Sequence, residues 1–170
     1  MSALSAGRGF GYGYKIRYSL IRRHKPLFAK PSSKVARYEL NDCFLIFWFR
    51  FCYRYSYLLE LKGYDQLRRL IVRDYAVFSG HALEEYFRRK FAESGRWTRL
   101  GGWWDRRGEN ELDLVAENEL DEEFLVGEVK RDKKRIDLDV VRRKLAAFLS
   151  ATGEWKGKTP KVVALSIEDM

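Results

Sequence analysis

The chain has 170 residues, of which 46% are hydrophobic and 15% aromatic, enough for one packed domain or one domain with an extension. Two histidines and two cysteines at no metal-ligand spacing argue against a zinc site and against histidine-based nucleophilic catalysis. The net charge of +9 is concentrated at one end, because residues 1–40 hold nine basic residues and one acidic residue. Such a block favours polyanions, nucleic acid first and an acidic membrane second, or it is a solvated tail without a partner.

The opening segment, GRGFGYGYK, is rich in glycine but lacks the Gly-Lys-Ser/Thr of a phosphate-binding loop. It also lacks the long apolar run of a secretory signal. Cys43 and Cys52 lie in an aromatic stretch and are best explained as buried thiols in a reducing cytosol. We therefore expect a cytoplasmic protein without a membrane partner.

Residues 41–61 are densely aromatic and predict a helix that Asn41 or Asp42 caps. The unbroken apolar run of residues 43–49 is far below the roughly 20 residues of a membrane helix. Arg50 and Arg54 would share one edge of this helix, and the aromatic rings would pack inward or bind bases. A second amphipathic helix is expected over residues 65–78, with these side chains inward: Leu67, Leu70, Ile71, Tyr75 and Phe78. Residues 1–78 then form a basic, mostly helical extension.

A break or a close packing point is expected at Gly80, before a helix over residues 81–93. Leu83, Phe87 and Phe91 recur at helical spacing and predict a buried stripe, with Glu84 at its edge. A strand is expected over residues 97–104, in which Trp103 and Trp104 point to opposite faces. One ring is expected in the core, and the other, taken as Trp104, could stack on a nucleotide.

Residues 111–130, ELDLVAENELDEEFLVGEVK, predict two strands, 111–116 and 124–130, joined by an acidic turn. Alternation places Asp113 and Val115 on the face opposite Leu112. It also puts Glu128 and Lys130 on one face, where a hairpin brings Asp113 beside them. Two close carboxylates favour a divalent cation, for which Mg²⁺ or Mn²⁺ is suited, and the lysine can orient or deprotonate a water. The alternative is an ordinary surface ion pair of little energetic value.

The last forty residues predict a helix over 137–150 and a buried strand over 161–166. Basic residues follow the candidate site and also mark the helix surface, where a phosphate backbone could pass; they are Arg131, Lys133, Lys134, Arg142 and Arg143. Lys144 is expected on the same outer side.

The order helix, three strands, helix, strand resembles the core of the PD-(D/E)xK, or restriction-endonuclease-like, nuclease superfamily. That resemblance assigns residues 79–170 to an α/β nuclease-like core. It implies that Asp113 and Glu128 bind Mg²⁺ or Mn²⁺, that Lys130 positions water, and that Glu84 assists as a further metal ligand. For Glu84, ion pairing with Arg88 or Arg89 is an equal alternative.

A narrower resemblance rests on SGHALEEYFRRKF, GGWWDRRGENELDLVAEN and FLVGEVKR. These segments are similar to the C-terminal domain, long catalogued as of unknown function, of a prokaryotic AAA-type ATPase family, although Leu83 replaces the usual aromatic residue. The resemblance implies a DNA-directed nuclease, a separately encoded ATPase partner and, as for many such nucleases, a possible homodimer. The alternatives are an inactive nucleic-acid-binding or ATPase-docking module, or a fragment of a longer gene. In that family, residues 1–40 correspond to the end of a winged-helix segment.

Overall fold

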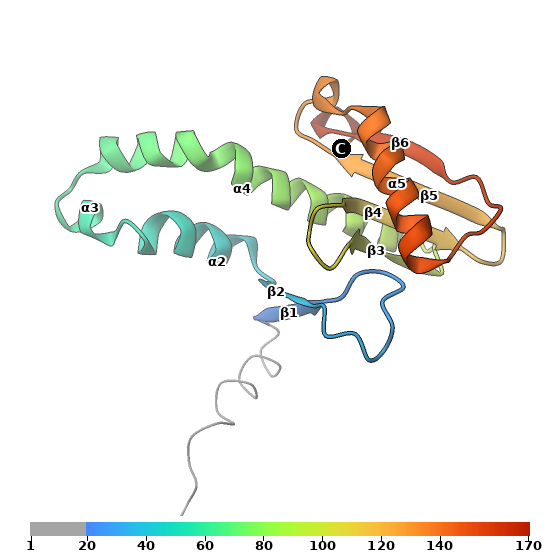
Figure 1. The fold of residues 1–170 in the computed structure, drawn as a ribbon. Helices are drawn as coiled ribbons and strands as arrows, with labels where there is room; N and C mark the ends of the chain where they lie inside the picture. Colours follow the sequence, from blue (N-terminus) through green and yellow to red (C-terminus); the bar gives the residue numbers. More distant parts are fainter. Residues whose placement is uncertain (1–19) are drawn as a thin grey trace, which may run out of the picture. The chain divides into compact units, whose positions relative to one another are not determined.

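The computed structural model describes residues 20–170, which form helices and two β-sheets (Figure 1). They divide into two compact units. The first comprises residues up to His24 together with Ala36–Leu67, and the second comprises Lys25–Val35 and Arg68–Met170. The predicted basic residues 8, 15 and 17 and the glycine-rich opening lie outside the described residues. The predicted division into domains at residue 78 stays a prediction.

The described part of the first unit begins with a two-stranded antiparallel sheet, β1 (Ile21–His24) and β2 (Arg37–Leu40), in a region predicted to be mostly helical. Then follow α2 (Cys43–Phe47), a π-helical segment η1 (Trp48–Tyr53) and α3 (Ser56–Glu60). The predicted helix is therefore confirmed in part: residues 43–53 are helical without a break, and a turn at residues 54–55 separates them from α3. The predicted cap is confirmed, because the Asp42 carboxylate accepts a hydrogen bond from the Leu45 N–H at 2.9 Å.

Most aromatic side chains of α2, η1 and α3 are exposed, contrary to the prediction that they pack inward. Phe51 is fully buried, whereas the exposed rings include those of Phe44, Trp48, Phe49, Tyr53 and Tyr57. The physical reason is that the aromatic residues surround the helical axis, and a helix packed on one side buries only one face.

Helix α4 (Tyr64–Glu93) runs for 30 residues without interruption through Gly80. A single glycine costs a helix roughly 1 kcal/mol relative to alanine, too little to end a long one. Close packing is also absent at this position, since a Cβ atom added to Gly80 meets nothing within 4 Å. Both interpretations of Gly80 are therefore wrong. Tyr75, predicted to point inward, is 44% exposed.

We expect Gly80→Ala to stabilise the protein by about 0.5–1 kcal/mol, because alanine loses less backbone entropy in a helix and space is open around it. Urea unfolding followed by circular dichroism measures the change. Gly153→Ala is the matched control, since Gly153 ends α5 with φ 70° and alanine there should destabilise instead. Equal shifts for the two variants would contradict this explanation.

The second unit holds a four-stranded sheet in the order β3 (Arg99–Trp104), β4 (Glu111–Asn118), β5 (Glu123–Val129) and β6 (Lys161–Leu165). The first three strands are antiparallel neighbours, and β6 runs parallel to β5. Helix α5 (Leu138–Thr152) connects β5 to β6, and short 3₁₀ turns, η2 (Lys133–Arg135) and η3 (Ile167–Asp169), follow β5 and β6. The predicted order of elements from α4 onward is present.

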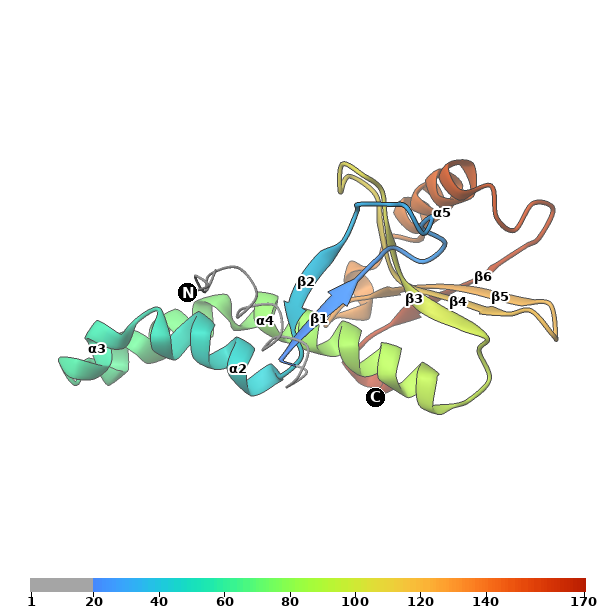
Figure 2. The same cartoon turned by 90° about the horizontal axis from the view of Figure 1, so that it is seen from below.

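Each face of this sheet has a helix packed on it (Figure 2). Val141 and Phe148 of α5 pack with Val126 and neighbouring side chains on one face. Leu83 and Phe87 of α4 pack with Val129 on the other, and Phe91 extends this contact as the helical stripe predicted. The strands are therefore buried on both faces, which explains why their central residues are nearly all apolar.

A β-bulge interrupts β4 close to the candidate site. Gly101 pairs with Val115, but Trp103 pairs with Leu112, so β4 has one residue more than β3 between these pairs. Leu112 and Val115 therefore pack in the same cluster, although simple alternation predicted opposite faces. The bulge changes which way the residues at the start of β4 point.

The segment between β1 and β2 completes the core of the second unit. The Leu27 N–H donates a hydrogen bond to the Gly102 carbonyl at 2.9 Å, at the edge of the sheet. The Phe28 ring lies 5.9 Å from the Phe148 ring and 5.8 Å from the Trp155 ring, measured between centroids. Residues 25–35, called the strap below, thus pack over one end of the sheet face that α5 covers.

Candidate functional site

Asp113 lies where β4 and β5 stop pairing. The last backbone pair is Leu114 with Gly127, and beyond it the Asp113 carboxylate accepts a hydrogen bond from the Val129 N–H at 2.8 Å. A side chain therefore takes the place that a carbonyl of β4 would have in a regular ladder. The bulge and this side-chain hydrogen bond fix the Asp113 carboxylate beside the end of β5.

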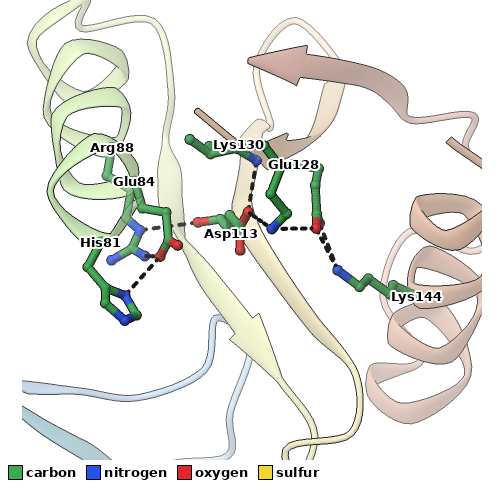
Figure 3. A network of polar contacts seen from close by, with 8 residues as sticks. His81, Glu84, Arg88, Asp113, Glu128, Lys130 and Lys144 are labelled. Atoms are coloured by element: carbon green, nitrogen blue, oxygen red, sulfur yellow. Dashed lines mark hydrogen bonds and ion pairs between the residues drawn. The ribbon is translucent and has the colours of Figure 1, made fainter. Parts of the chain in front are cut away.

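The structure brings the three central site residues together (Figure 3). The Lys130 Nζ lies 3.0 Å from the Glu128 Oε1 and 3.8 Å from the Asp113 Oδ2. Both acidic residues are buried, at 7% and 5% exposed, whereas the Lys130 side chain is 43% exposed. Two buried carboxylates thus share one cation that solvent can reach.

Glu84 joins this network from α4. Its Oε2 accepts a hydrogen bond from the Arg88 guanidinium at 3.2 Å and lies 3.9 Å from the His81 Nδ1. Arg88 also donates to the Asp113 carbonyl at 3.1 Å, so it ties α4 to β4. The ion pair with Arg88, the alternative expected for Glu84, is therefore present. The role of Glu84 as a metal ligand stays a prediction. Arg88 is a site residue that the sequence pattern assigned only to surface pairing.

The surroundings perturb the protonation of both Asp113 and Lys130. Burial, and then the nearby charges of Glu84 and Glu128, raise the pKa of Asp113 to about 7. Burial lowers the pKa of Lys130, but the charges of Asp113 and Glu128 outweigh it, so the pKa is raised overall. At neutral pH the site therefore holds a charged lysine next to a carboxyl group that ionises reluctantly.

Lys144 is a site residue that sequence reasoning placed on the outer side of its helix. Its Nζ lies 2.8 Å from both carboxylate oxygens of Glu128. The signal in the sequence was its spacing, three residues after Val141 and four before Phe148, which puts it on the buried face of α5.

These residues lie within a stretch that a family model recognises. The model for DUF234, described as archaeal and bacterial proteins of unknown function, matches residues 48–146. The chain belongs to the DUF234 family. An uncharacterized protein of Methanocaldococcus jannaschii is 31% identical over 141 residues. The match covers 75% of this chain and 31% of the relative, so the chain spans about a third of that relative's length. No solved structure matches the chain.

In the part of this DUF234 chain from residue 20 to 170, no three His, Cys, Asp or Glu side chains are placed so that they could hold a metal ion. Mg²⁺ does not require three, because it commonly takes one or two carboxylates and keeps several waters. Asp113 and Glu128 meet that smaller requirement, since the single ammonium group of Lys130 already contacts both. Carboxylates are the donors that Mg²⁺ and Mn²⁺ prefer, so the donor types are suitable, and binding of either ion at this pair stays a prediction.

The basic residues predicted to contact nucleic acid in this DUF234 chain have different surroundings. The Arg131 guanidinium lies over the Tyr75 ring at 5.6 Å, and Lys133 pairs with Asp169 at 2.9 Å. Arg142 pairs with Asp139 at 2.7 Å on the exposed side of α5. Lys134 and Arg143 are also exposed. All five remain accessible to a polyanion.

Trp104 does not suit its predicted role in the DUF234 chain. The two tryptophans lie near the end of β3, and both are buried, Trp103 at 4% and Trp104 at 9% exposed. A ring so covered offers no free face for a nucleotide base, and the prediction of stacking on Trp104 is wrong. Trp103 lies in the core cluster on the α5 face of the sheet. Among residues 20–170, no helix has the length and apolar character needed to cross a membrane.

Proposed function

We propose that this chain is a metal-dependent nuclease that hydrolyses phosphodiester bonds, with DNA as its first candidate substrate. The observation that carries the proposal is the pair of buried carboxylates, Asp113 and Glu128, bridged by the partly exposed Lys130. Buried like charges beside a cation, with the pKa of Asp113 raised to about 7, are typical of functional sites.

The arrangement of elements supports this proposal. A helix, three antiparallel strands, a helix and a parallel fourth strand follow one another from α4 to β6. This order resembles the PD-(D/E)xK core, with Asp113 on its second strand and Glu-Val-Lys at the end of its third. We infer that the second unit has this nuclease fold.

The residues have separable roles in the proposed reaction. Asp113 and Glu128 would hold Mg²⁺, which when bound lowers the pKa of a water and offsets charge on the phosphoryl oxygen. The raised pKa of Lys130 keeps it protonated, so it orients water and pairs with the phosphate rather than removing a proton. Glu84, held by Arg88, adds negative charge that favours a cation next to Asp113.

We expect Asp113→Ala and Lys130→Ala to reduce plasmid cleavage in Mg²⁺ or Mn²⁺ at least 100-fold, the scale for losing one electrostatic group of an active site. Calorimetric titration should show metal binding in the wild type and its loss in Asp113→Ala. Lys156→Ala, which removes an exposed lysine away from the site, is the matched control and should cleave normally. Cleavage that persists in both purified site variants would refute the proposal.

A non-cleaving nucleic-acid-binding module is the second candidate. The observation that favours it is the pairing of Glu128 and Glu84 with cations, Lys130 and Lys144 for the first and Arg88 for the second. This candidate predicts salt-sensitive DNA binding that EDTA leaves unchanged. Absence of binding at low salt would remove it. Association with a separately encoded ATPase, which the resemblance implies, is likewise a proposal.

A further inference from the structure

Two lysine ammonium groups contact the single carboxylate of Glu128. The Lys144 Nζ lies 2.8 Å from both oxygens, and the Lys130 Nζ lies 3.0 Å from Oε1. The Glu128 side chain is only 6% exposed and that of Lys144 only 19%. Water screens these charges poorly, so their effect on a nearby ion is larger than that of a surface pair.

The two lysines reach Glu128 from different elements (Figure 3). Lys130 follows β5 and lies on the side of Asp113, where its Nζ contacts both acids. Lys144 comes from α5, and its Nζ contacts both carboxylate oxygens of Glu128. An ion that binds both carboxylates would take the place of the Lys130 ammonium, whereas the contact with Lys144 can persist.

The acidic and basic groups of the site nearly balance before any ion binds. Four acidic groups, those of Glu84, Glu85, Asp113 and Glu128, contact three basic groups, those of Arg88, Lys130 and Lys144. A divalent cation added alone therefore gives the site an excess of positive charge. A phosphodiester bound at the same time removes part of that excess, so the two ligands should favour each other's binding.

We propose that Lys144 is a positioning residue and built-in counter-ion of Glu128: it holds the carboxylate in place, weakens binding of a free divalent cation, and makes that binding depend on a phosphodiester. This inference rests on the proposed function. It assigns to α5 a role in the order in which the ligands bind, which is separate from the chemistry of Asp113 and Lys130.

The first test is calorimetric titration of Mn²⁺, without nucleic acid, into the wild type, Lys144→Gln, Lys144→Arg and Lys156→Gln. Glutamine keeps an N–H donor for Glu128 but removes the charge, so Lys144→Gln should bind Mn²⁺ on the order of tenfold more tightly. Lys144→Arg keeps the charge and should bind as the wild type does, and so should the exposed control Lys156→Gln. Unchanged or weaker Mn²⁺ binding by folded Lys144→Gln would overturn the inference.

The second test begins with the wild type, so its first outcome does not depend on the folding of a variant. Mn²⁺ is titrated with and without a phosphorothioate oligonucleotide that resists cleavage. We expect the oligonucleotide to tighten Mn²⁺ binding about tenfold or more, and this gain to shrink in Lys144→Gln. No gain in the wild type would overturn the inference.

The two proposals fail in distinguishable ways. Mn²⁺-dependent cleavage by the wild type with identical Mn²⁺ affinity in Lys144→Gln would leave the nuclease proposal standing and overturn only the role of Lys144. Absence of Mn²⁺ binding in every variant, with and without the oligonucleotide, would overturn both.

Discussion

Asp113→Asn is expected to stabilise the metal-free protein at pH 8 by about 4 kcal/mol, even though it should abolish the proposed cleavage. Burial and the charges of Glu84 and Glu128 raise the pKa of Asp113 to about 7, from an ordinary 3.8. Asparagine carries no charge in that place, and its side-chain oxygen can still accept the hydrogen bond from the Val129 N–H. Asp113 would thus serve the proposed function while lowering the stability of the fold.

The direction of the pH dependence follows from the raised pKa. Below about pH 4 the carboxyl group is protonated in both the folded and the unfolded wild type, so the full stability is present. As the pH rises towards 7, the unfolded chain releases this proton more readily than the folded protein does, and the free energy of unfolding falls. Above pH 7 both states are ionised, and the loss is complete. Asp113→Asn should show no such loss.

Urea unfolding in EDTA at pH 4 and pH 8 measures this difference. The gap between Asp113→Asn and the wild type should be small at pH 4 and should open at pH 8. Glu154→Gln, an acid-to-amide change at an exposed position, is the matched control and should shift stability by no more than about 0.5 kcal/mol at either pH. A gap of equal size at both pH values would show that burial of the Asp113 charge is not its cause.

Local sequence patterns predicted the hairpin that carries the site. The predicted strands, 111–116 and 124–130, differ from β4 and β5 by two residues or fewer at each end. Alternation also placed Glu128 and Lys130 on one face correctly, because no bulge interrupts β5. These features depend on residues close in sequence, which is why pattern and spacing could predict them.

Features that depend on packing between distant segments were not predicted. The bulge in β4 arises from its pairing with β3, and it moved Leu112 to the face of Val115. Lys144 was placed on the surface because basic residues usually lie there, but the strand beneath its helix offered a buried carboxylate. A charged residue at core spacing on a helix is therefore a reason to look for a buried partner of opposite charge.

Phe148→Ala should destabilise the protein by about 3–5 kcal/mol, the cost of removing a fully buried ring and leaving a cavity. The Phe148 ring packs against Phe28, Trp103 and Trp155, with centroid distances of 5.9, 5.4 and 5.0 Å. It therefore joins the strap of residues 25–35, the sheet and the segment after α5. Three of these partners are rigid aromatic rings, which refill the space poorly.

Chemical unfolding of Phe148→Ala beside Leu120→Ala tests this expectation, because Leu120 is 87% exposed in the turn between β4 and β5. The control should change stability by no more than about 0.5 kcal/mol. Phe28→Ala should share part of the loss, and the double variant should lose less than the sum of the single losses, since the two rings are in contact. Additive losses would mean that the strap does not pack on Phe148. Because Phe148 lies one helical turn after Lys144, loosening α5 should also weaken the hold of Lys144 on Glu128.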